Sequence, residues 1–182
     1  MLKLISKEKL ILIPAIIFVT AVAGTAIYIS YINVNPALEK ALREQFGEDF
    51  FKFESELPEV NSEADQLEDI IDKYEPLFLN LEERSLERLE TLFQNAIAEY
   101  NERKKTGTYD RLQLTNKYSQ AGRLLEQNVD RSFYLLLNQM ETELKRRDLP
   151  TGIIKEIESS FIAAKTEKKL ELFGRLREKV NR

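Results

Sequence analysis

The side chains that carry most enzyme chemistry are missing from this sequence. Its 182 residues contain no histidine and no cysteine, which removes the commonest general base, the commonest transition-metal ligand and any thiolate nucleophile. Two serines, Ser119 and Ser132, have no histidine that could activate them in a triad. No phosphate-binding loop, dinucleotide fingerprint or nucleophile elbow occurs. We therefore predict a non-enzymatic protein with no catalytic residue, no cofactor-binding residue and no cofactor.

A run of acidic residues is the remaining candidate for metal chemistry, because carboxylate oxygens are ligands for calcium. The run lacks the glycine and the spacing of an EF-hand loop, and a regular helix would direct its side chains to different faces. The pattern favours a solvated helix face, and we predict no metal ligand. The residues are Glu63, Asp65, Glu68, Asp69 and Asp72.

Two basic runs, Arg103-Lys104-Lys105 and Lys145-Arg146-Arg147, each close a predicted helix. Cations at these positions complement the negative end of the helix dipole. In an antiparallel bundle the two runs would lie at opposite ends, so they do not predict a single anion-binding patch. The net charge of −4 also argues against nucleic acid as a partner.

A long apolar stretch without any charge, Leu10–Ile32, organises the chain. As a helix its 23 residues would be about 35 Å long, enough to cross a hydrocarbon core of about 30 Å. The leader, residues 1–9, carries Lys3, Lys7 and Lys9, which favours a cytoplasmic amino terminus. We predict a single-pass protein of the cell membrane that contacts the lipid bilayer through Leu10–Ile32, with an extracytoplasmic carboxyl domain, residues 33–182.

A cleaved signal peptide is the alternative, because Ala21-Val22-Ala23 resembles a processing site. The apolar run continues for nine residues beyond Ala23, whereas a signal peptide normally becomes polar where it is cut. The pattern therefore favours an uncleaved anchor, and in either case residues 33–182 are exported.

A short helix should follow the anchor directly. Asn35 is a good N-cap, and Pro36 suits the first helical position. Two explanations remain for the apolar face, which is rich in phenylalanine: packing against later helices, which the abundant acidic residues favour, or contact with a membrane surface. The face repeats at intervals of three and four residues through Leu38, Leu42, Phe46, Phe50, Phe53 and Leu57.

Three long helices are predicted after this. The first carries an apolar pattern from Leu67 to Tyr100 and should stop near Gly107, with either a kink near Tyr74 or a new helix beginning at Glu75-Pro76. The others should span about 109–147 and about 151–180, separated by Asp148-Leu149-Pro150. The residues expected to face inward on the second long helix are Leu112, Tyr118, Ala121, Leu125, Val129, Phe133, Leu136, Met140 and Leu144.

The predicted fold class is all-α: an N-terminal transmembrane helix followed by an elongated antiparallel bundle of three long helices plus one shorter juxtamembrane helix. Residues 39–102 carry 19 acidic and 6 basic side chains, and residues 103–182 carry 18 basic and 11 acidic. This split favours pairing between the two halves. Asn128, beside the inner stripe, is a candidate for setting helix register. No sequence repeat stands out.

Three functions are compatible with this sequence. The favoured hypothesis is a scaffold, adaptor or assembly factor that binds another envelope protein or forms a homo-oligomer. An alternative is a module that binds a small molecule or lipid between helices, with Phe46, Phe50, Phe51 and Phe53 as the place to look. A third is an enzyme that cleaves wall glycans with carboxylates alone, but no single glutamate stands out.

Overall fold

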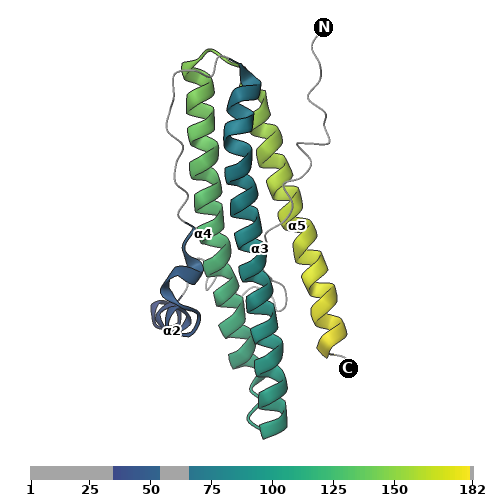
Figure 1. The fold of residues 1–182 in the computed structure, drawn as a ribbon. Coiled ribbons are helices and arrows are strands. Elements are labelled where there is room, and N and C mark those ends of the chain that lie inside the picture. The colour runs from purple at the N-terminus through teal and green to yellow at the C-terminus, as the bar shows by residue number, and fades with distance from the viewer. Residues whose placement is uncertain (1–34, 54–65, 181–182) are drawn as a thin grey trace.

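The computed structural model describes residues 35–53 and 66–180, and all regular structure within these ranges is helical. A short helix α2 (Pro36–Phe46) and a 3₁₀ turn η1 (Glu48–Phe51) precede three long helices, α3 (Leu67–Thr106), α4 (Arg111–Arg146) and α5 (Gly152–Val180). The long helices lie side by side with alternating direction, and α2 lies against α4 on the side away from α5 (Figure 1). The prediction of three long helices and one short one in an all-α fold is confirmed.

The predicted leader, residues 1–9, and the predicted membrane segment, Leu10–Ile32, lie outside the described residues. Among the helices of the two described ranges, none contains a stretch long and apolar enough to cross a membrane.

The start of α2 confirms the predicted cap, and its end corrects the predicted length. The side chain of Asn35 accepts a hydrogen bond from the backbone N–H of Ala37 at 2.9 Å, and Pro36 occupies the first turn. The helix was predicted to continue towards Leu57, but it ends at Phe46. Gly47 follows with φ of +96°, a value that breaks helical geometry and that glycine tolerates.

Helix α3 passes through Pro76 without a break, so the predicted alternative of a new helix at Glu75-Pro76 is wrong. Proline in a helix interior costs about 3 kcal/mol, but both neighbouring turns are anchored, because Tyr74 and Phe78 are buried. Burial of such rings offsets the lost hydrogen bond. The predicted stop is confirmed: Gly107 has φ of +70°, and its N–H donates to the carbonyl of Arg103.

The ends of α4 and α5 also agree with the sequence. Asp110 caps α4 by accepting from the N–H of Gln113 at 3.0 Å. After α4 the chain turns at Asp148, whose φ is +52°, and Pro150 precedes the start of α5. These local signals place each reversal of the chain within a few residues.

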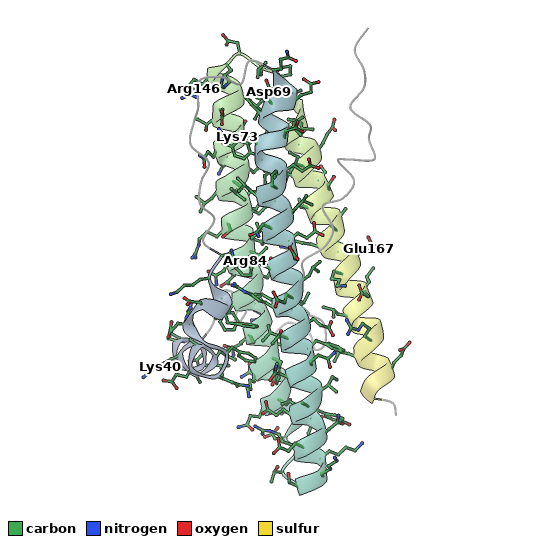
Figure 2. All side chains as sticks on the ribbon, in the orientation of Figure 1. Lys40, Asp69, Lys73, Arg84, Arg146 and Glu167 are labelled. Atoms are coloured by element: carbon green, nitrogen blue, oxygen red, sulfur yellow. The ribbon has the colours of Figure 1, made fainter. Side chains whose placement is uncertain are left out.

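An aromatic layer joins the three long helices. Phe78 of α3 lies 5.5 Å from Phe133 of α4 between ring centroids, and Phe133 stacks on Phe161 of α5 at 3.7 Å. Side chains fill the space between the helices, while the charged groups of Lys40, Arg146 and Glu167 project outward (Figure 2).

The predicted inward stripe of α4 is confirmed except at its first member. Tyr118, Ala121, Leu125 and the later members are buried, but Leu112 is 81% exposed. Leu112 lies six residues before Tyr118, which places it on a different face of the helix, and Leu114 takes the inward position instead.

Candidate functional site

A hollow of about 400 Å³ opens where α2, α3 and α4 meet beside the α3–α4 turn. Most of its walls are polar, and they come from segments far apart in the sequence. The hollow is lined by Gln45, Asn95, Ala98, Glu99, Glu102, Arg103, Thr106, Thr108 and Tyr118.

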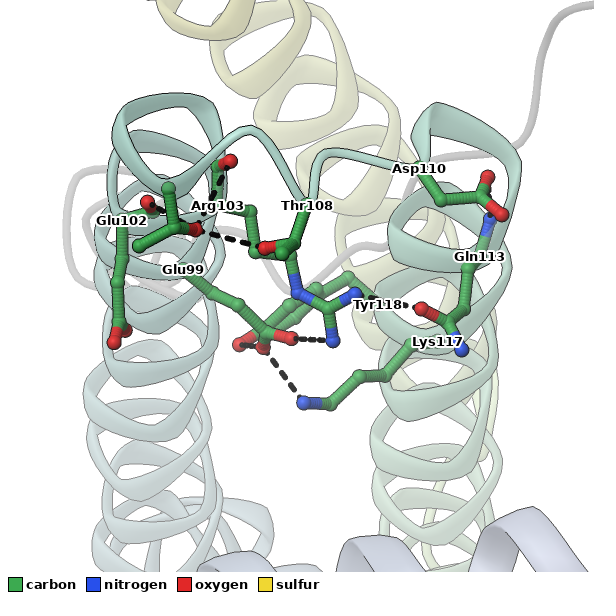
Figure 3. A network of polar contacts seen from close by, with 9 residues as sticks. Glu99, Glu102, Arg103, Thr108, Asp110, Gln113, Lys117 and Tyr118 are labelled. Atoms are coloured by element: carbon green, nitrogen blue, oxygen red, sulfur yellow. Dashed lines mark hydrogen bonds and ion pairs between the residues drawn. The ribbon is translucent and has the colours of Figure 1, made fainter.

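Glu99 lies at the centre of the polar network beside this hollow (Figure 3). Its carboxylate accepts from Lys117 Nζ at 2.6 Å and from the Tyr118 hydroxyl at 2.9 Å, and it pairs with the guanidinium of Arg103 at 2.7 Å. Burial alone would raise the pKa of Glu99, but the hydrogen bonds from Lys117 and Tyr118 outweigh it and lower that pKa. Glu99 is therefore ionised and fully engaged.

The other hydrogen bonds fix the shape of the turn. Arg103 also donates to Gln113 at 2.6 Å, which ties the last turn of α3 to the first turn of α4. The hydroxyls of Thr106 and Thr108 lie 2.8 Å apart. Burial, and next the hydrogen bond to Glu99, raise the pKa of the Tyr118 hydroxyl, so it stays protonated. Such walls suit hydrogen bonding to a small polar molecule better than proton transfer.

A cluster of the same four residue types lies near the other end of the α3–α4 pair. We call each cluster a clasp: the first consists of Glu99, Arg103, Lys117 and Tyr118, and the second of Lys73, Tyr74, Glu143 and Arg147. Glu143 of α4, whose side chain is 1% exposed, binds Lys73 Nζ at 2.9 Å and the Tyr74 hydroxyl at 3.1 Å, both from α3. It also pairs with Arg147, the C-cap residue that follows α4, at 3.1 Å. Burial again opposes ionisation of Glu143, but the hydrogen bonds from Lys73 and Tyr74 prevail and lower its pKa.

The two clasps are related by a fixed interval in the sequence. Lys117, Tyr118, Glu143 and Arg147 each stand 44 positions after Lys73, Tyr74, Glu99 and Arg103. Each set contributes its Lys-Tyr pair from one helix and its glutamate and arginine from the other. This repeat was not predicted from the sequence, although two signals of it are present there: the Lys-Tyr dipeptide occurs twice, and in both sets the arginine follows the glutamate by four residues.

The phenylalanines from Phe46 to Phe53 pack against other side chains of the bundle. Phe51 is fully buried and meets Phe46 and Phe50 at centroid distances of 6.2 and 5.0 Å. Phe53 lies under the guanidinium of Arg88 at 4.3 Å, and its carbonyl accepts from the Ser132 hydroxyl at 2.6 Å. None of these rings lines the hollow.

Three further sequence candidates can be placed in part, since Glu63 and Asp65 of the acidic run lie outside the described residues. Within residues 35–53 and 66–180 no three acidic side chains converge as a metal site, and Asp69 instead accepts from the N–H of Gln66 at the start of α3. The basic runs that close α3 and α4 lie at opposite ends of the pair, as predicted. Asn128 donates to the carbonyl of Leu124 in its own helix, so its hydrogen bond does not join two helices.

Glu82 is the unusual buried acid of the bundle. It is 9% exposed, and its Oε2 has no hydrogen-bond partner. Burial raises its pKa to about 7. Helical spacing places Glu82 on the α3 face that carries Phe78 and Phe93, and the guanidinium of Arg175 from α5 covers Phe93 at 4.3 Å. Glu82 has the raised pKa of a general acid, but it is enclosed and does not line the hollow.

No known protein family, curated protein or solved structure matches this chain.

Proposed function

We propose that this chain is a non-enzymatic single-pass membrane protein whose helical bundle acts as a scaffold or adaptor at the extracytoplasmic face of the cell membrane. The anchor is Leu10–Ile32, with the basic leader on the cytoplasmic side. The observation that carries the proposal is the position of this apolar, uncharged stretch, whose last residue, Ile32, lies three residues before the N-cap of α2 at Asn35.

The interior of the bundle supports a structural role. Half-buried Glu99 and buried Glu143 are each held by three donors, which suits them to fixing helix register. Leaving one partner of such a cluster unpaired is costly, so the arrangement favours one alignment of α3 and α4. The three long helices then form a rod in which α3 and α4 keep one alignment. Such a rod can present a constant surface to another protein.

Exposed apolar side chains on the rod supply contact points for a partner. Leu135 on α4 is 55% exposed, and Ile162 and Leu170 on α5 are 52% and 69% exposed. Large apolar side chains are the usual anchors of a protein interface when they become buried together.

Photocrosslinking in intact cells tests the proposal. A photoreactive residue at Leu135, Ile162 or Leu170 should link the chain to one identifiable envelope protein or to a second copy of itself. A photoreactive residue at exposed Glu83 serves as a control for non-specific capture. A reporter fused after Arg182 should be active outside the cytoplasm. A cytoplasmic reporter, or equal crosslinking from Glu83, would contradict the proposal.

The hollow favours a second candidate function, a module that binds a small polar ligand. Its lining of amide, hydroxyl and charged groups fits a sugar or an amino acid better than a lipid. Thermal denaturation of the full chain in detergent with such compounds should show ligand-dependent stabilisation. Ala98→Leu should remove it by filling the hollow, and Leu135→Ala should retain it. Stabilisation that survives Ala98→Leu would place the ligand elsewhere.

A further inference from the structure

The chain joins the bundle close to one end. The backbone N–H of Asn35 donates to Gln120 Oε1 at 2.9 Å. Gln120 lies nine residues from Arg111, where α4 begins, and 26 residues from Arg146, where it ends. At about 1.5 Å per residue these intervals are about 14 Å and about 39 Å. The α3–α4 turn is therefore the end of the rod nearest to the point of attachment.

The connection to the anchor is short. Two residues, Asn33 and Val34, separate Ile32 from Asn35, and three steps along the chain reach at most about 11 Å. The end of the rod near Arg146 cannot face the bilayer through so short a link. With the α3–α4 turn directed towards the bilayer, the distance of about 14 Å brings the turn to the edge of the hydrocarbon or into the headgroup layer.

The turn carries side chains suited to that layer. We call residues 104–112 the tip. Leu112 is 81% exposed, and Tyr109 is 40% exposed with its ring edge-on to Tyr100 at 5.1 Å. Lys104 and Lys105 are exposed, and Lys104 Nζ lies 5.5 Å from the centre of the Tyr100 ring. Tyrosine and lysine are typical of membrane interfaces, and an exposed leucine gains by leaving water.

The tip is also uncovered by the rest of the bundle. In Figure 1 the α3–α4 turn extends beyond the end of α5, and α2 lies against α4 further up. The exposure of Leu112 therefore does not come from a groove that α5 would fill.

We propose that the tip rests in the headgroup layer of the phospholipid bilayer, with Leu112 at the hydrocarbon edge and Lys104 and Lys105 beside lipid phosphates. This inference rests on the membrane anchor proposed above. Contact at the tip would add a second attachment to the anchor and hold the rod upright, so that the exposed residues of α4 and α5 face partners rather than lipid.

A single tryptophan tests the proposal, because the chain has none. Full-length Leu112→Trp is reconstituted into vesicles of phosphatidylcholine and phosphatidylglycerol, with and without brominated acyl chains. Its emission should shift to the blue and lose most of its intensity when the chains are brominated. Leu135→Trp is the matched control, on the same helix and 15 residues beyond Gln120, about 22 Å. It should keep a water-like emission and lose little intensity.

Further variants strengthen the test. Tyr109→Trp should behave like Leu112→Trp if the whole tip enters the layer. Lys104→Glu with Lys105→Glu should reduce the quenching of Leu112→Trp, since phosphate contacts are lost. Circular dichroism checks that each variant keeps its helices.

The possible failures are separable. If Leu112→Trp emits as in water and is not quenched while the protein floats with the vesicles and resists extraction by carbonate, the tip proposal is wrong and the anchor stands. If the protein is extracted by carbonate, the anchor itself is wrong, and the tip proposal fails with it.

Discussion

Replacing Glu82 by glutamine should make the bundle more stable at alkaline pH. Burial raises the pKa of this carboxyl from 4.5 to about 7, so the folded state binds a proton that the unfolded chain releases. Between these pH values stability therefore falls as pH rises, by about 1.4 kcal/mol per unit. The loss is complete above pH 7 and amounts to about 3 kcal/mol. Glutamine keeps the shape of the side chain and cannot ionise, so the variant should lack this loss.

Urea denaturation of the full chain in detergent measures the effect at pH 5 and pH 8. Other groups titrate in both proteins, so the informative quantity is the difference between wild type and Glu82→Gln at each pH. That difference should be small at pH 5 and about 3 kcal/mol in favour of the variant at pH 8. Glu83→Gln, on the exposed neighbour, should leave the wild-type pH dependence unchanged. If the free energy of unfolding changed equally between pH 5 and pH 8 in Glu82→Gln and in wild type, the conclusion that burial raises the pKa of Glu82 would be refuted.

Three further substitutions test the packing and the clasps, each by denaturant titration. Glu143→Ala should lower the free energy of unfolding by about 3 to 5 kcal/mol, because Lys73 and Arg147 lose a buried partner, and an effect below about 1 kcal/mol would contradict the clasp. Phe51→Ala should cost about 3 to 5 kcal/mol through the cavity it leaves, whereas a membrane-facing ring would cost little without lipid. Asn35→Ala should cost about 1 kcal/mol and Asn35→Asp much less, since only alanine loses the cap.

Local signals in the sequence were sufficient to locate most helix ends. Asn35 and Pro36 start α2, Gly107 stops α3, and Pro150 separates α4 from α5. Each signal acts within one or two turns of the helix, so the residues next to a helix end are sufficient to locate it. The inward stripe of α4 followed from spacing alone, and the error at Leu112 came from including a residue that does not fit that spacing.

Contacts between helices decided what the sequence could not. Pro76 stays within a helix because Tyr74 and Phe78 are buried on either side of it. Burial of Glu82 in the bundle, with its Oε2 lacking a hydrogen-bond partner, is likewise a result of packing, because in the sequence Glu82 is one among many glutamates.

The clasps at Glu99 and Glu143 also separate what is local in the sequence from what depends on contacts between helices. The sequence by itself determined a chain of amphipathic helices with an uncharged stretch before them, because periodicity and caps are local properties. Only the tertiary structure decided that Glu99 and Glu143 are paired, that Glu82 is buried and which end of the rod carries the exposed tip. The pairing of side chains from two helices depends on the alignment of those helices, and that alignment is set by packing along their whole length.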